Sequence, residues 1–392
     1  MRRSTHRTPC PRSRPHPIAP RAALARCLGS ALCVSSLAGC GKGSFEGDSY
    51  RELMDEAVEA GLPGVALYVS SPRDHFDGAA GERLLGEADY QPEDLFRIAS
   101  NSKSFLGVVA AQLAVEGRLD LDDPLADHLP AGLVSRIENA DRATLRQALN
   151  HTSGIYDYLG SDGFWEEVDD GRTRAWTTEE ALTYAYDEPA SFRAGTDWEY
   201  SNTNYLLAGL VIDEVVGHHH AIEIRERILD PLGMTHTFYE LEEPVTGDLV
   251  HGYSYYFERD ELFDTAELEQ GYGLADGGIV ATAADIGTYI RALGGGDRLL
   301  SDPVRAALFG DAIETGEGDD YGLGISVFPS RYGDVVGHGG ALEGYLSEMY
   351  YYPDEDTTIV VFTNTTDGYF RAESSPEDVF DDLIGAVERL TF

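Results

Sequence analysis

The stretch Phe96-Arg97-Ile98-Ala99-Ser100-Asn101-Ser102-Lys103-Ser104-Phe105 opens a strongly apolar helix that is expected to run towards Gly117. Glycine commonly follows the last residue of a helix, because it accepts a left-handed backbone. Ser100 falls in the first turn, and Lys103 lies about 4.5 Å further along the axis on the same face. A hydroxyl and an amine one turn apart form a candidate nucleophile and base.

Lysine is scarce in this sequence, which has 29 Lys and Arg residues but only two lysines, Lys42 and Lys103. By itself, a serine three residues before a lysine is a weak signal, since an N-cap serine with a solvated lysine gives the same pattern. Arginine keeps its proton in proteins, whereas lysine can lose it. A lysine retained within an apolar helix therefore favours the interpretation as a base.

Two further segments carry chemistry. Tyr200-Ser201-Asn202 precedes a predicted helix over 205–216, and in an extended segment Tyr200 and Asn202 would point to the same side. Gly337-His338-Gly339-Gly340-Ala341 ends a predicted strand, where the glycines allow close approach and His338 offers a donor or a cation. Taken separately, a loop tyrosine with a capping asparagine explains the first segment better, and a structural histidine explains the second equally well.

In this order, the S-x-x-K, Y-x-N and H-x-G motifs resemble those of the serine β-lactamase and penicillin-binding protein superfamily. The nearest resemblance is to D-alanyl-D-alanine carboxypeptidases grouped with class C β-lactamases, and to related esterases and D-aminopeptidases. It extends from about Tyr50 to Leu390. Further segments that share it are Asn150–Tyr158, Phe192–Gly217, Asp276–Gly278, Thr282–Ile286 and Tyr321–Gly324.

The resemblance implies catalysis through an acyl-enzyme. Ser100 attacks a carbonyl carbon, while Lys103 and Tyr200 share the proton transfers. Asn202 holds the substrate amide, and His338 supplies positive charge or a proton relay. Because a base must be neutral, burial must lower the pKa of Lys103 towards neutrality.

The backbone N–H groups of Ser100 and Ala341 are implied to form the oxyanion hole, and Gly339 and Gly340 to contact substrate. The sequence departs from the carboxypeptidases here. Those enzymes hold the terminal carboxylate of the substrate with hydroxyl residues, and this chain has Gly339 and Ala341 at the corresponding positions. They also use an arginine on the preceding strand, which this chain lacks. Arg331 is nearby in the sequence but displaced from that position. We therefore expect a serine acyl hydrolase for amides or esters, with carboxypeptidase, β-lactamase, esterase and N-terminal peptidase activities open. The alternative is a penicillin-binding sensor or slow binding protein on the same fold.

Strands are predicted near both ends of the chain, with helices between them. This order, together with the resemblance, indicates an α/β sandwich in which helices flank an antiparallel, five-stranded-type sheet. The α/β part would comprise residues 49–118 and 275–392, and a helical inserted part residues 119–274. A site between the two parts is expected.

The formal net charge is −40, from 29 basic and 69 acidic residues, which excludes a basic surface for nucleic acids. Residues 1–39 hold seven arginines and end in a short apolar stretch, and they resemble a lipoprotein signal peptide. Cys40 would then be lipidated and residues 40–48 would form a linker. This predicts an exported protein held at the cell envelope by its lipid anchor alone, with a small-molecule or peptide substrate.

No cofactor or metal site is expected. The four cysteines all lie within residues 1–40. His218-His219-His220 is interpreted as a loop or helix start, because consecutive histidines cannot all face one ion from a helix.

Overall fold

The computed structural model describes residues 45–172, 174–255, 262–296, 299–366 and 375–392. The predicted signal peptide, the lipidation site Cys40 and the first part of the linker lie outside the described residues.

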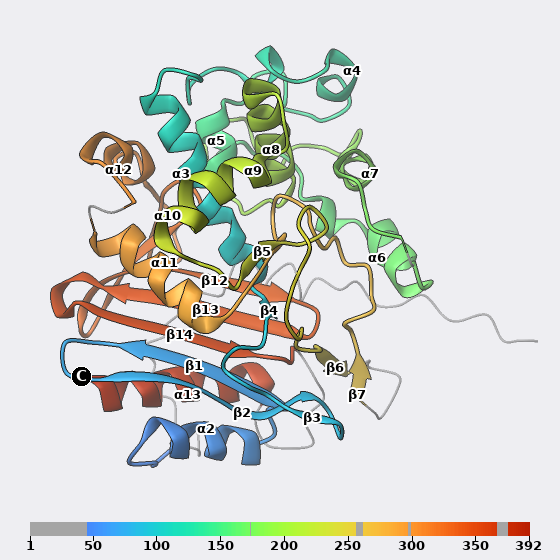
Figure 1. Ribbon diagram of the computed structural model, residues 1–392. Coiled ribbons are helices and arrows are strands. Elements are labelled where there is room, and N and C mark those ends of the chain that lie inside the picture. The colour runs from blue at the N-terminus through green and yellow to red at the C-terminus, as the bar shows by residue number, and fades with distance from the viewer. Residues whose placement is uncertain (1–44, 173, 256–261, 297–298, 367–374) are drawn as a thin grey trace, which may run out of the picture.

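An antiparallel sheet forms the centre of the α/β part (Figure 1). Its strands follow the order β3-β2-β1-β14-β13-β12-β11-β10-β9. The expected antiparallel sheet is confirmed, although it continues beyond five strands at both edges. The strands are β1 Gly64–Ser70, β2 His75–Leu84, β3 Ala88–Asp89, β9 Ile313–Glu314, β10 Asp320–Tyr321, β11 Ser326–Ser330, β12 Gly333–Leu342, β13 Tyr345–Tyr352 and β14 Thr357–Thr363.

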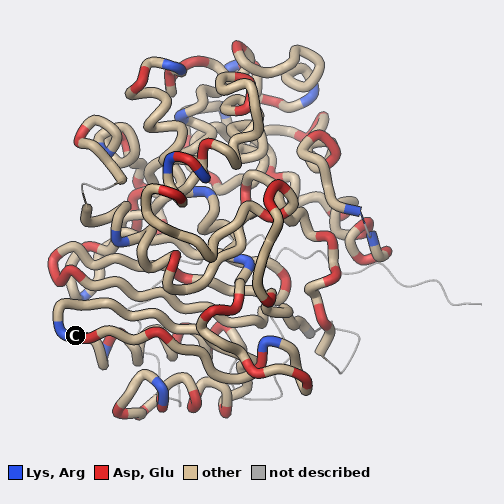
Figure 2. Tube along the Cα trace, viewed as in Figure 1, with Lys and Arg blue, Asp and Glu red and all other residues tan. Residues whose placement is uncertain are grey.

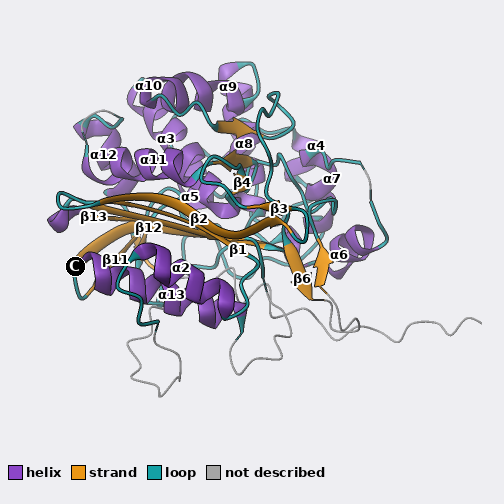
Figure 3. Ribbon diagram, turned by 60° about the horizontal axis from the view of Figure 1, so that its bottom comes forward, coloured by secondary structure: helices purple, strands orange, loops and turns teal. Residues whose placement is uncertain are grey.

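Helices cover both faces of this sheet. Helices α2 (Tyr50–Glu59) and α13 (Pro376–Thr391) pack on one face, as Figure 3 shows. Helix α11 (Ala283–Gly295) lies on the other, against β13 and β14. Strand β14 is consequently buried along its whole length, which agrees with its continuous β-branched and apolar sequence.

Helix α3 (Ser102–Val115) lies between the sheet layer and the helical part, and residues on all its sides are buried. Gly117 follows its C-cap with φ +71°, as predicted. The middle of the chain is mostly helical, as expected. It contains α4 Ala131–Val134, α5 Leu145–Leu149, α6 Asp162–Asp169, α7 Thr178–Leu182, α8 Thr203–Val216, α9 His220–Ile224 and α10 Asp230–Leu232; α12 Asp302–Phe309 follows later in the chain.

Several short strands were not predicted, because two or three residues are too few to show an alternating pattern. They form a three-stranded sheet in the order β4-β8-β5 and a hairpin of β6 and β7. Their bounds are β4 Phe96–Arg97, β5 Thr237–Tyr239, β6 Tyr253–Tyr255, β7 Leu262–Asp264 and β8 Ile279–Ala281. Strand β4 leads directly into the predicted nucleophile turn, so β8 fixes the start of that turn.

Acidic residues are spread over most of the described chain, and basic residues are fewer and scattered (Figure 2). Among the described residues, no helix has the length and apolarity needed to cross a bilayer.

A buried carboxyl group lies beneath α13. Glu348 of β13 is 8% exposed, and burial raises its pKa to about 8. The neighbouring titratable groups are Tyr350, which hydrogen bonds to it, and Asp381 of α13, whose negative charge also raises its pKa.

We expect Glu348→Gln to gain stability relative to the parent as the pH rises. Below pH 4 both the folded and the unfolded carboxyl are protonated. Between pH 4.5 and 8 only the unfolded state releases its proton, so the parent loses folding free energy. The difference should grow by about 2–3 kcal/mol from pH 5 to 7, measured by urea unfolding. A difference that does not change with pH would contradict this expectation.

Candidate active site

The nucleophile turn is a 3-10 segment, Ala99–Asn101, directly before α3. Ala99 has φ +49°, a left-handed conformation that costs about 1–3 kcal/mol and persists only where the surroundings impose it. Asn101 Nδ2 donates a hydrogen bond to Ser347 Oγ of β13 over 2.8 Å. The turn is thereby held against the sheet, and Ser100 is 6% exposed.

Lys103 is fully buried, and its Nζ atom contacts three oxygens. It lies 3.0 Å from Ser100 Oγ, 2.8 Å from Asn202 Oδ1 and 2.7 Å from the backbone oxygen of Asp276. Burial lowers the pKa of Lys103 to about 8, and the charges of Asp276 and Asp157 oppose this shift. A neutral amine is therefore accessible near neutral pH, within hydrogen-bonding distance of the serine hydroxyl.

Tyr200 lies beside the same pair of residues. Its hydroxyl shares a hydrogen bond with Ser100, and its ring centroid is 5.1 Å from Lys103 Nζ. Burial raises the pKa of Tyr200 well above 10, so the phenol stays protonated at neutral pH. The phenol is thus suited to donating or relaying a proton, while Lys103 is the better base.

Asn202 has both ends of its side-chain amide bonded within the protein. Its Oδ1 accepts from Lys103, and its Nδ2 donates to Asp157 Oδ2 over 3.0 Å. Its backbone N–H donates to Asp157 Oδ1 over 3.1 Å. The side chain therefore positions Lys103 in this structure, and its expected contact with a substrate amide stays a prediction.

Asp157 and Asp276 were missed as site residues. Burial raises the pKa of Asp157 to about 6 and raises that of Asp276 as well. Both lie in segments that carry the family resemblance. Asp157 and Asn202 are 45 positions apart and Lys103 and Asp276 are 173 apart, so local sequence carries no signal for these roles.

His338 is buried on β12, and both of its ring nitrogens have partners. Its Nδ1 donates to the backbone oxygen of Gly339, and its Nε2 accepts from the Tyr321 hydroxyl over 2.8 Å. Burial and the charge of Lys103 lower its pKa to about 3. The ring is therefore neutral near pH 7, which favours the proton relay over the positive charge among its two expected roles; the role of His338 stays a prediction.

Two glycines of β12 face opposite sides of the sheet. A Cβ atom on Gly340 would lie 2.3 Å from the backbone oxygen of Ile98, beside the nucleophile turn. A Cβ atom on Gly339 would lie 2.7 Å from Glu348 Oε1, on the face that α13 covers. Gly340 therefore permits the close approach of strand and turn, whereas Gly339 can contribute only its backbone to a site at Ser100. Ala341, the next residue, pairs with Leu346 of β13.

Gly340→Ala should separate β12 from the nucleophile turn. The added methyl group requires the backbone at Ile98 to shift, and misplacement of a reacting group by about 1 Å can cost about 100-fold in rate. We expect a loss of about that size in kcat/KM with a cooperative thermal transition retained. Gly132→Ala is the control, since a Cβ atom there meets nothing within 4 Å. Equal activities of the two variants would contradict the expectation.

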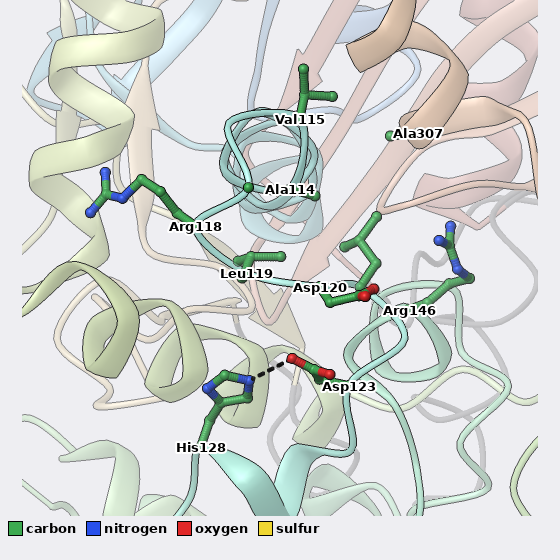
Figure 4. Close-up of a pocket in the computed structure, with 11 residues that line it drawn as sticks. Ala114, Val115, Arg118, Leu119, Asp120, Asp123, His128, Arg146 and Ala307 are labelled. Atoms are coloured by element: carbon green, nitrogen blue, oxygen red, sulfur yellow. Dashed lines mark ion pairs between the residues drawn. The ribbon is translucent and has the colours of Figure 1, made fainter.

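A hollow of about 640 Å³ lies at the other end of α3 (Figure 4). Its lining includes Ala114, Arg118 and the ion pair His128–Asp123 at 3.6 Å. Since α3 has 14 residues, the hollow is about 20 Å from Ser100. It is separate from the catalytic constellation.

The three consecutive histidines lie at a helix start, as expected: His219 is the N-cap of α9, which begins at His220. Asp213, His219 and His220 have potential ligand atoms within 4.8 Å of one another, a grouping that was not predicted. His220 Nδ1 bonds to Asp213, and its Nε2 bonds to the Tyr239 hydroxyl over 2.7 Å. These contacts account for the cluster as a cap for α9.

Comparisons with known proteins place the chain by sequence and by fold. Penicillin-binding protein 4* of Bacillus subtilis is 28% identical over 284 residues, which cover 69% of this chain and 60% of that protein. A D-stereospecific amidohydrolase from a Streptomyces species has 29% identity and a TM-score of 0.71, covering 86% of this chain and 96% of the other. A D-amino acid amidase from Ochrobactrum anthropi, at 24% identity and a TM-score of 0.74, covers 88% and 99% and shares the fold.

The family model named Beta-lactamase matches residues 50–382. That range contains Ser100, Lys103, Tyr200, Asn202 and His338. It begins with α2 and ends within α13, so it includes the sheet, its covering helices and the helical part. The chain therefore belongs to the Beta-lactamase family, within the superfamily of serine β-lactamases and penicillin-binding proteins.

Proposed function

We propose that this protein is a serine hydrolase that cleaves amides or esters through an acyl-enzyme on Ser100. The observation that carries the proposal is the buried amine of Lys103, 3.0 Å from Ser100 Oγ. Its pKa of about 8 allows it to accept the serine proton near neutral pH.

In this mechanism, Ser100 Oγ bonds to the substrate carbonyl carbon and its proton passes to Lys103. The backbone N–H groups of Ser100 and Ala341 would stabilise the oxyanion. Tyr200 gives its proton to the departing amine or alcohol and regains one from Lys103, so the carbonyl–leaving-group bond breaks. Water then attacks the ester on Ser100, passing one proton back to the serine oxygen, and the acid is released.

We further propose substrates without a free carboxylate on the leaving group. Gly339 and Ala341 offer no hydroxyl, and Arg331 lies 3.7 Å from Glu388 of α13, beyond the sheet from Ser100. Arg97 is buried and bound to Glu240 over 2.8 Å, so it is not available for a substrate anion. Among the described residues, neither of these two arginines is free to bind a terminal carboxylate, and without such a cation peptide free acids lose their main anchor. Amino acid amides, such as those named for the structural neighbours, fit this site better.

The test compares kcat/KM for D-phenylalanine amide, a short acyl ester and a dipeptide free acid ending in D-alanine. We expect the amide or the ester to be cleaved at least tenfold faster than the free acid, with Ser100→Ala inactive on all three. Preference for the free acid would overturn the substrate proposal. A stable adduct with penicillin and no turnover of any substrate would instead support the sensor.

A further inference from the structure

Asp157 contacts Asn202 in a way that determines which end of the Asn202 amide faces Lys103. Its Oδ2 accepts from the side-chain Nδ2 of Asn202, and its Oδ1 accepts from the backbone N–H. We infer that Asp157 is a positioning residue for the hydrolysis proposed above: its carboxylate holds the Asn202 amide so that oxygen, not the NH2 group, faces Lys103. This inference rests on the proposed function.

The chemistry of the groups makes this orientation specific. An ionised carboxylate only accepts hydrogen bonds, so the NH2 end of Asn202 must face Asp157. The amide oxygen then faces the opposite way, 2.8 Å from Lys103 Nζ. Lys103 Nζ donates to that oxygen and to the backbone oxygen of Asp276, and these two bonds place the amine beside Ser100. They can form whether the amine of Lys103 is protonated or neutral.

The segment that carries Asp157 is fixed independently of this contact. The backbone N–H of Tyr158 donates to Thr203 Oγ1 over 2.8 Å, and the Tyr158 hydroxyl donates to Asp276 Oδ2 over 3.0 Å. The backbone N–H of Leu159 also donates to Asp157 Oδ1 over 3.3 Å. These contacts hold the carboxylate in place in addition to its own bonds to Asn202.

Asp157→Asn preserves the shape of the side chain but no longer determines which end of the Asn202 amide faces Lys103. The new amide at position 157 uses its oxygen for the backbone donors and turns its NH2 group towards the NH2 group of Asn202. The clash of two donors is relieved when Asn202 turns over, which presents an NH2 group to Lys103 in place of an oxygen. Lys103 then loses one of its three hydrogen bonds and its fixed distance to Ser100.

The matched control is Asp276→Asn. The charges of Asp276 and Asp157 both raise the pKa of Lys103, so either substitution should move the acid limb of the pH profile to lower pH. Only the backbone oxygen of Asp276 contacts Lys103, and that contact survives the substitution. The other titratable groups close to Lys103 are unchanged in both variants, and they are His338, His151, Tyr200 and Tyr205.

We expect kcat to fall about 100-fold in Asp157→Asn, with KM changed less than threefold. In Asp276→Asn we expect kcat to fall less than tenfold. Adding Asn202→Asp to Asp157→Asn should regain at least tenfold over the single variant. The carboxylate then stands at position 202, where it accepts from both Lys103 and the new amide at position 157. Because a carboxylate in contact with Lys103 raises the pKa of the amine, the activities are compared on the plateau above the acid limb of each variant. Circular dichroism and thermal melts verify the fold of each variant.

Three results would overturn the inference: kcat of Asp157→Asn within threefold of the parent, an equal loss in Asp276→Asn, or a double variant no more active than the single one. None of these affects the proposed function as long as Ser100→Ala is inactive. Full activity of Ser100→Ala would instead defeat the proposed function itself.

Discussion

Lys103→Met should lower kcat/KM by about 10³-fold and remove the acid limb from the pH profile. A positioned general base contributes about 10²–10⁴-fold, and methionine fills a similar volume without accepting a proton. In the parent, the amine is protonated and inactive as a base below its pKa of about 8. The kcat/KM of the parent should therefore rise about tenfold per pH unit below pH 8 and level off above it.

The measurement is kcat/KM from pH 5.5 to 10 for the parent and the variant. Lys42→Met is the natural control, because Lys42 is the only other lysine in the sequence, and we expect it to leave the profile unchanged. An acid limb near pH 8 that persists in Lys103→Met would assign the limb to another group and remove Lys103 from its role as base.

Ser100→Ala should abolish turnover, with a loss of about 10⁴-fold or more, because no other group can form the acyl bond. The substitution removes a single oxygen atom, so the fold should persist. Ser104→Ala is the matched control: Ser104 is buried on the same helix, donates to the backbone oxygen of Asn101 and accepts from the Tyr289 hydroxyl. We expect it to lower stability by about 1–3 kcal/mol and activity by less than tenfold. Comparable losses in the two variants would indicate that helix packing, not chemistry, explains the effect of Ser100→Ala.

The features that sequence predicts here are local ones. Ser100 and Lys103 are three residues apart on one helix, so helical geometry alone brings them together. The apolar helix expected after Ser100 is observed as α3 over Ser102–Val115. The order of the three motifs then identified the superfamily, and the sheet follows from it.

The features that escaped prediction depend on long-range contacts or on burial. Asp157 meets Asn202 across 45 positions and Asp276 meets Lys103 across 173 positions, so both contacts depend on tertiary folding. The neutrality of His338 follows from its burial and from the nearby charge of Lys103, neither of which a sequence reports. The opposite directions of Gly339 and Gly340 follow from the register of β12 with β13, in which Gly339 pairs with Glu348.

Part of the negative net charge lies within the site. From Cys40 onwards the chain has 22 basic and 69 acidic residues, a net charge of −47. Two of the acidic residues, Asp157 and Asp276, lie close to Lys103. Burial lowers the pKa of Lys103, and the charges of these two residues raise it. The resulting pKa of Lys103 is about 8, so near that pH the amine can both accept and return a proton.

The most direct test of the account is the intact mass of the protein, quenched within milliseconds to seconds of mixing with an activated acyl ester, with peptide mapping of any adduct. We expect one acyl group on Ser100 in the parent and none in Ser100→Ala. Turnover of the ester without an adduct on Ser100, or an adduct of equal yield in Ser100→Ala, would contradict catalysis through this serine.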